Sequence, residues 1–104
     1  MARVLYSVIA TLPDESTARE FIGWLSAGHI ADVIGCGAES GMAVRMDSAD
    51  RPRVMAQYVF ASREALERYV AVDAPRLRAE GLAKFPASRG VTFERAVGSI
   101  EHAE

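Results

Sequence analysis

Cysteine and lysine are almost absent from this sequence: Cys36 is the only cysteine and Lys84 the only lysine among 104 residues. A single cysteine excludes a disulfide bond within the chain and fits a reducing compartment, so we expect a cytoplasmic protein. The 12 basic and 14 acidic residues are interspersed and give a net charge of −2. Because no basic stripe could follow a phosphate backbone, we expect no nucleic-acid partner.

Long hydrophobic runs are also missing. The apolar segment at residues 4–12 is too short to cross a bilayer as a helix, and only Arg3 precedes it, so we expect neither a membrane protein nor a secretory signal. Half of the residues are hydrophobic (50%), which is enough for one small core. We therefore expect a single domain that spans residues 1–104.

The hydrophobic periodicity changes in a regular order along the chain. Apolar residues alternate in the segments predicted as strands and recur with helical spacing in the segments predicted as helices. The predicted elements are a strand at 4–12, a helix that ends between 33 and 37, strands at 40–46 and 53–60, a helix at 62–85 broken near residue 75, and a strand at 91–100. This β-α-β-β-α-β order predicts an α+β protein with a ferredoxin-like fold, in which both helices cover one face of an antiparallel sheet.

Local signals indicate where the helices begin and break. Residues 14–17 offer several N-cap side chains for the first helix, and Thr17 and Glu20 have the spacing of a capping box. Ser62 is expected to cap the second helix. Pro75 is expected to interrupt that helix near residues 73–74, because its ring and its missing N–H disturb helical hydrogen bonding.

Both faces of the predicted sheet carry apolar side chains. We expect one face to hold Tyr6, Val8, Met42, Val44, Tyr58, Phe60, Phe93 and Val97, and the other to hold Leu5, Ile9, Met55, Val59 and Ile100. Helices can cover only one of these faces, and a large exposed apolar patch indicates an interface. We therefore expect a homodimer joined sheet to sheet, with a cavity between the sheets.

One group of residues extends over nearly the whole chain: Trp24, His29, Ile30, Gly37, Gln57, Tyr58, Tyr69, Ala74, Pro75, Leu77, Arg78 and Phe85. Together they resemble a family of small bacterial domains of unknown function in the dimeric α/β-barrel superfamily. Ala31 departs from that pattern, since the family usually has a proline after the His-Ile pair. The resemblance implies a ferredoxin-like homodimer without an established activity. The monooxygenases, haem-degrading enzymes and isomerases of the superfamily suggest a ligand pocket by analogy.

His29 is the first candidate for a catalytic or ligand-binding residue. It lies on the apolar stripe of the first helix, and Asp32 three residues later could orient its imidazole. The alternative is that His29 closes the helix–sheet core and hydrogen-bonds a backbone carbonyl. On a regular helix Trp24 lies about 140° from His29, so the two share a ligand pocket only if Gly28 bends the chain; otherwise Trp24 is a packing residue.

Two tyrosines and one arginine are further candidates for ligand binding. Tyr6 and Tyr58 occupy alternating positions whose face could line the cavity between the sheets, where a phenol can donate a hydrogen bond to a small polar ligand. The alternative for both is a place in the core. Gln57 would then point to the opposite face. Arg45, in a predicted strand otherwise free of charge, could bind a carboxylate or lie on an exposed edge.

The remaining polar candidates suggest structural roles. Arg78 and Asp73 flank the helix break and are expected to close it with an ion pair. Cys36 has no nearby base except His29, which argues against a reactive thiol. His29, His102 and Cys36 are the only soft ligands, so we expect no metal site. No glycine-rich phosphate loop or nucleophile elbow points to a cofactor either.

These observations leave three hypotheses for function. The first is a homodimer that binds a small, largely apolar molecule in an inter-sheet or helix–sheet cavity. The second is a cofactor-independent enzyme of the monooxygenase or isomerase type, with His29 as base and Tyr58 or Tyr6 as proton donor. The third is a structural protein whose apolar sheet pairs with a different protein, which predicts a monomer when the chain is alone.

Overall fold

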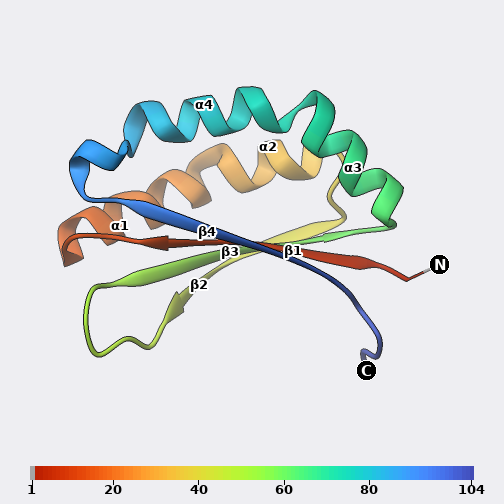
Figure 1. The fold of residues 1–104 in the computed structure, drawn as a ribbon, viewed down its shortest axis with the longest axis horizontal. Helices are drawn as coiled ribbons and strands as arrows, with labels where there is room; N and C mark the ends of the chain where they lie inside the picture. Colours follow the sequence, from red (N-terminus) through yellow and green to blue (C-terminus); the bar gives the residue numbers. More distant parts are fainter. Residues whose placement is uncertain (1) are drawn as a thin grey trace.

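Four antiparallel strands form a single sheet in the order β2-β3-β1-β4 in the computed structural model, which describes residues 2–104 (Figure 1). The strands are β1 (Val4–Thr11), β2 (Ser40–Met46), β3 (Arg53–Phe60) and β4 (Thr92–Ser99). The helices are α1 (Glu15–Trp24), α2 (Ile30–Gly35), α3 (Arg63–Val72) and α4 (Ala74–Lys84), with a π-helical turn η1 (Leu25–His29) and a 3-10 turn η2 (Ala87–Arg89). This element order and strand order confirm the ferredoxin-like fold.

Side-chain caps fix the beginnings of the helices. Asp14 caps α1, since its Oδ1 accepts a hydrogen bond of 2.8 Å from the backbone N–H of Thr17. The predicted capping box of Thr17 and Glu20 is therefore wrong, because Thr17 already lies in the first turn. Ser62 caps α3 as predicted, with its Oγ accepting from the N–H of Ala65 at 3.1 Å. The predicted break at Pro75 is confirmed as well, because α3 ends at Val72 and α4 begins at Ala74.

The helices all lie against one face of the sheet, called the covered face below (Figure 1). In β1 and β3 this face is formed by the even-numbered residues, since Tyr6 is paired with Tyr58 and Val4 with Phe60. These four side chains are at most 4% exposed. The hydrophobic core therefore lies between the covered face and the helices, so Tyr6 and Tyr58 lie under the helices and not in a cavity between two sheets.

The prediction for β2 places its side chains on the wrong faces. Gly41 is paired with Tyr58, so Gly41 lies on the covered face, while Met42 and Val44 point to the opposite one. A Cβ atom at Gly41 would lie 2.9 Å from both Ile30 Cγ2 and Tyr58 Cδ1. Because the Tyr58 ring and Ile30 already fill this space, a side chain here would clash, and Met42, Val44 and Met46 lie on the opposite face, while Arg45 lies on the covered face beside α1.

The opposite face of the sheet, called the open face below, carries a second set of apolar side chains. Among residues 2–104, no helix packs on it (Figure 1). Its apolar members come from three neighbouring strands: Leu5, Ile9, Met42, Val44, Met46, Met55 and Val59. Met42 is 54% exposed. The described part of the chain contains no helix that is both long and apolar enough to cross a membrane.

Candidate functional site

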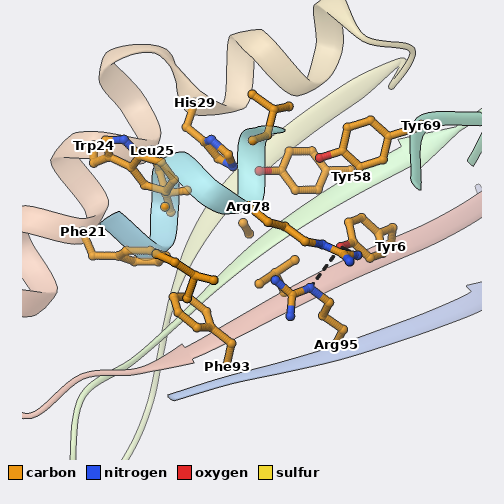
Figure 2. A pocket seen from close by; sticks show the side chains of 15 residues that line it. Tyr6, Phe21, Trp24, Leu25, His29, Tyr58, Tyr69, Arg78, Phe93 and Arg95 are labelled. Carbon is orange, nitrogen blue, oxygen red and sulfur yellow. Dashed lines mark hydrogen bonds between the residues drawn. The ribbon is translucent and has the colours of Figure 1, made fainter. Parts of the chain in front are cut away.

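A cavity lies between the covered face and the helices, bounded by β1, β3 and β4 below and by α1, η1, α3 and α4 above (Figure 2). Its volume is about 50 Å³, which is room for several water molecules. Phenylalanine, tyrosine and tryptophan supply six of the fifteen residues in its wall: Tyr6, Phe21, Trp24, Tyr58, Tyr69 and Phe93. The polar groups in the wall, apart from the tyrosine hydroxyls, belong to His29, Arg78 and Arg95.

One end of the cavity is apolar and depends on a glycine of α4. The Phe21 ring packs against Trp24 with 5.8 Å between ring centroids and against Phe93 with 6.1 Å. Gly81 lies directly over the indole, because a Cβ atom at this position would lie 3.1 Å from Trp24 Cη2. Leu82 follows at the rim and is 53% exposed. This end can therefore hold an apolar group, and Leu82 is free to move aside.

Trp24 and His29 are brought together by an irregular turn. Their rings stack with 4.1 Å between centroids and an interplanar angle of 22°. The π-helical turn η1 separates them, and within it Gly28 leaves helical geometry (φ 175°, ψ −23°). The extra residue in this turn removes much of the angular offset that a regular helix would place between Trp24 and His29. The bend at Gly28, which was the condition for a shared pocket, is therefore present.

His29 lies between the cavity and a recess on the outer side of the helices. Trp24, Gly28, Asp32 and Glu80 form that recess with it. Burial lowers the pKa of the His29 imidazole, while the carboxylates of Asp32 and Glu80 act in the opposite direction. The imidazole is therefore neutral at pH 7, and one ring nitrogen is free to accept a proton.

The other end of the cavity is polar and is centred on the Tyr6 hydroxyl. Arg78 Nη2 from α4 and Arg95 Nε from β4 each donate a hydrogen bond of 3.2 Å to Tyr6 Oη (Figure 2). The Tyr69 ring lies 6.2 Å from the Tyr6 ring, and burial raises the pKa of Tyr69 to about 12. Two guanidinium groups from different elements thus meet at one phenol oxygen.

Two buried polar atoms in this wall have no hydrogen-bond partner among the described residues. They are the hydroxyl oxygen of Tyr58 and Nε of Arg78. Tyr58 is only 2% exposed, and its burial raises the pKa of the phenol, which stays protonated. Unpartnered buried polar atoms are uncommon in folded proteins, because each costs free energy.

The structure places several other candidates outside this cavity. Arg45 forms an ion pair with Glu15 at the beginning of α1, with Nη1 2.9 Å from Oε2. Gln57 lies on the open face, opposite to Tyr58 as expected. The predicted ion pair between Arg78 and Asp73 is wrong, since Arg78 turns toward the sheet to reach Tyr6.

Asp73 and Cys36 belong to a separate surface cluster with Arg76. Arg76 Nη2 lies 3.9 Å from the Asp73 carboxylate and 3.8 Å from Cys36 Sγ. Desolvation, followed by the charge of Asp73, raises the pKa of the Cys36 thiol. A raised pKa makes the thiolate scarce, so the geometry gives no support to a nucleophilic role. Within residues 2–104, no three His, Cys, Asp or Glu side chains are grouped to hold a metal ion.

Several residues of the cavity wall were not predicted as site residues. Arg95 and Phe93 alternate on β4 and share the covered face with Tyr6, so a charged residue at an inward position was the available signal. Phe21 and Tyr69 lie on the buried sides of α1 and α3, where nothing in the sequence distinguishes a cavity wall from an ordinary core position. No sequence pattern near Arg78 predicted its position in the cavity wall, because that position depends on the contact between α4 and β1.

Comparison with protein-family models gives one match, to the domain of unknown function DUF4286 over residues 3–100. This chain belongs to the DUF4286 family. The match covers nearly the whole chain and confirms the resemblance to a family of unknown function. No curated protein matches the chain. The family assignment therefore brings no activity with it.

Solved structures similar to this DUF4286 domain share its fold at low sequence identity. A dimeric ferredoxin-like protein from an uncultured marine organism has 12% identity and a TM-score of 0.74, with 100% of both chains covered. A monooxygenase of Streptomyces coelicolor, from the gene ActVA-Orf6 and in complex with nanaomycin D, has 14% identity and a TM-score of 0.69 over 99% of this chain and 91% of its own. SnoaB, a cofactor-independent oxygenase from Streptomyces nogalater, has 14% identity and a TM-score of 0.61 over 99% and 97%. At these identities the likeness concerns the fold alone.

Proposed function

We propose that this DUF4286 domain binds a small apolar or aromatic molecule in the cavity between its sheet and its helices. The observation that carries the proposal is the unpartnered hydroxyl of Tyr58, buried in a wall made mostly of aromatic and aliphatic side chains. A concave, mostly apolar site with a few convergent polar groups is the usual form of a small-molecule site. A bound ligand would supply the missing partner for Tyr58.

The size of the cavity limits the ligand. A volume of about 50 Å³ is well below the roughly 150 Å³ of an engineered cavity that takes up benzene. A ring can enter only if side chains at the rim move, and Leu82 and Arg95 are the exposed ones there. We therefore expect a ligand of one ring or less inside the wall, with any larger part projecting past Leu82.

A homodimer formed by two open faces is the second part of the proposal. Apolar side chains from three strands lie there without a covering element, and a second copy of the chain would bury them. The structural neighbour described as dimeric supports this arrangement. Met42→Glu places a charge on this face, and Ala83→Glu places the same charge on the exposed surface of α4. Light scattering after size exclusion should give a dimer for the native chain and for Ala83→Glu, and a monomer for Met42→Glu; a monomeric native chain would refute this part.

A second candidate function is cofactor-independent catalysis with His29 as general base and Tyr58 or Tyr6 as proton donor. The observation in its favour is the neutral, partly buried imidazole in the cavity wall, which is the protonation state that a base needs. The two oxygenases described above make the oxidation of a one-ring substrate by dioxygen the first reaction to try. His29→Gln should abolish turnover of a substrate while leaving its binding within about threefold. Equal turnover by this variant would remove His29 as the base.

Binding itself is tested first, because both candidates require it. Trp24 is the only tryptophan and lies in the cavity wall, so its fluorescence reports directly on occupancy. We expect native mass spectrometry of the freshly purified protein to detect a bound molecule, and neutral one-ring compounds such as benzamide to change the Trp24 emission with saturation. Gly81→Leu, which fills the apolar end, should abolish this response, while Ala83→Leu on the exposed side of α4 should keep it. No saturable response from any one-ring compound would refute the proposed function.

A further inference from the structure

We propose that the polar end of the cavity recognises an anionic oxygen, so that the ligand is a small aromatic carboxylate or phenolate rather than a neutral ring. The inference rests on the proposed function, since it specifies the ligand class of the same cavity. It is carried by three features of the cavity wall: the bonding of the Tyr6 hydroxyl, the unpaired charges of Arg78 and Arg95, and the two unpartnered polar atoms.

The bonding of Tyr6 leaves a donor free. A phenol oxygen has two lone pairs and one proton. Arg78 and Arg95 each donate to Tyr6 Oη at 3.2 Å, which uses both lone pairs. The Tyr6 hydroxyl has no acceptor among the described residues, so its proton is available to a ligand. The two guanidinium groups also polarise this O–H bond and make it a better donor to a negative oxygen.

The positive charge at this end is not compensated by the protein. Arg45, Arg76 and Arg89 each have a carboxylate within 4.0 Å, whereas Arg78 and Arg95 have none within the part of the chain that the structure describes. Arg78 is half-buried, so solvent screens its charge only in part. A half-buried cation beside a second one is stabilised by an anion between them.

The unpartnered atoms are both able to donate. Nε of Arg78 carries a proton and cannot accept, and the Tyr58 hydroxyl remains protonated and has no acceptor. At this end of the cavity the available donors are therefore the Tyr6 O–H and the Arg78 Nε–H, and the Tyr58 hydroxyl, which points toward His29 in Figure 2, is a further donor in the same wall. An ionised carboxylate or phenolate only accepts hydrogen bonds, which makes it the complement of such a wall. A neutral amide would place its own N–H groups against these donors.

The test compares one-ring ligands with and without a negatively charged oxygen. Benzoate, 4-nitrophenolate and benzamide are titrated into the native protein, with the Trp24 indole and the arginine Nε–H signals followed by NMR. We expect at least one of the two anions to bind about tenfold or more tightly than benzamide. A preference for benzoate alone identifies a carboxylate site, and a preference for 4-nitrophenolate alone identifies a phenolate site. Equal affinity for all three compounds would overturn the inference and leave the proposed function standing.

Variants locate the preference within the wall. Arg78→Gln and Arg95→Gln should each reduce the affinity for the preferred anion about tenfold and change that for benzamide less than threefold. Arg51→Gln, at an exposed position in the β2–β3 turn, makes the same change in net charge and should have no effect. Arg95 is exposed, so its variant keeps the test decisive even if Arg78→Gln fails to fold. An anion preference that survives in the folded arginine variants, or is lost equally in Arg51→Gln, would contradict the inference. Failure of all three compounds to bind would instead refute the proposed function itself.

Discussion

The covered and open faces of the sheet are both rich in apolar side chains, but they differ in their polar groups. The covered face carries the Tyr6 and Tyr58 hydroxyls and the Arg95 guanidinium around a cavity. The open face carries aliphatic and thioether side chains beside scattered polar ones such as Arg53, Gln57 and Glu94, and no cavity lies among them in the described residues. Apolar content alone therefore does not separate a ligand site from a protein contact. The convergence of unpartnered polar groups on the covered face distinguishes the ligand site from the protein contact.

The largest expected difference between the two faces is the loss in free energy of unfolding when a side chain is removed. Phe60 is fully buried on the covered face, so Phe60→Ala should lower the free energy of unfolding by about 3–5 kcal/mol. Val59, its neighbour on the open face, is only partly buried, and Val59→Ala should cost about 1 kcal/mol. Urea denaturation measures both variants. Similar losses would mean that the two faces are equally well packed.

A smaller difference is expected for the addition of a methyl group. Gly41→Ala places a Cβ 2.9 Å from the Tyr58 ring and from Ile30, and this overpacking should cost about 1–3 kcal/mol. Gly23→Ala is the control, since Gly23 is exposed on α1, away from the proposed dimer contact, and a Cβ there meets nothing within 4 Å. We expect its unfolding midpoint in urea to remain within experimental error or rise slightly. A Gly41→Ala variant as stable as the native chain would contradict the packing described for β2.

Two tyrosine-to-phenylalanine changes on the covered face should change the free energy of unfolding in opposite directions. Tyr58→Phe removes an unpartnered buried hydroxyl and should raise the free energy of unfolding by about 1 kcal/mol in the absence of ligand. Tyr6→Phe removes the oxygen that accepts from Arg78 and Arg95 and should lower it by about 1 kcal/mol. Thermal and urea unfolding of the ligand-free variants measure both. A loss of stability in Tyr58→Phe would mean that its hydroxyl has a partner.

The smallest expected effect is a pH dependence of stability. The pKa of His29 is lowered by burial from its ordinary value of 6.5, so the unfolded chain binds this proton more readily than the folded one. The contribution of His29 to stability is therefore complete above pH 6.5 and decreases as the pH falls from there toward the lowered pKa. His29→Gln should flatten the pH dependence of the unfolding free energy over this range. If the free energy of unfolding of His29→Gln depended on pH as steeply as that of the native chain, the burial of His29 would be contradicted.

The fold could be predicted from the sequence because strand alternation and helix breaks are local signals. Apolar and other side chains alternate clearly around Tyr6 and Tyr58. Pro75 breaks its helix because its own ring and missing N–H disturb helical hydrogen bonding. β2 was assigned to the wrong faces because its larger residue, Met42, lies on the open side, where Gly41 leaves room for the Tyr58 ring. Nothing in the sequence of β2 itself indicates that the Tyr58 ring lies beside it.

The polar end of the site could not be predicted for the same reason. Arg78 and Tyr6 are 72 residues apart, and their contact exists only because α4 packs across β1. The stacking of Trp24 on His29 required a π-helical turn that a regular helical period does not contain. Sequence patterns predicted His29, Trp24, Tyr6 and Tyr58 as candidates, and tertiary packing brought them to one cavity.

The most direct test of ligand binding is an NMR titration of the isotopically labelled protein with benzoate. If the cavity under the helices is the ligand site, saturable shifts will be confined to the covered face and the elements above it, with the Trp24 indole and Arg78 Nε–H signals moving most. The open-face amides of Met42 and Met55 should stay in place. Shifts centred on the open face, or no saturable shift with benzoate, benzamide or 4-nitrophenolate, would contradict the account.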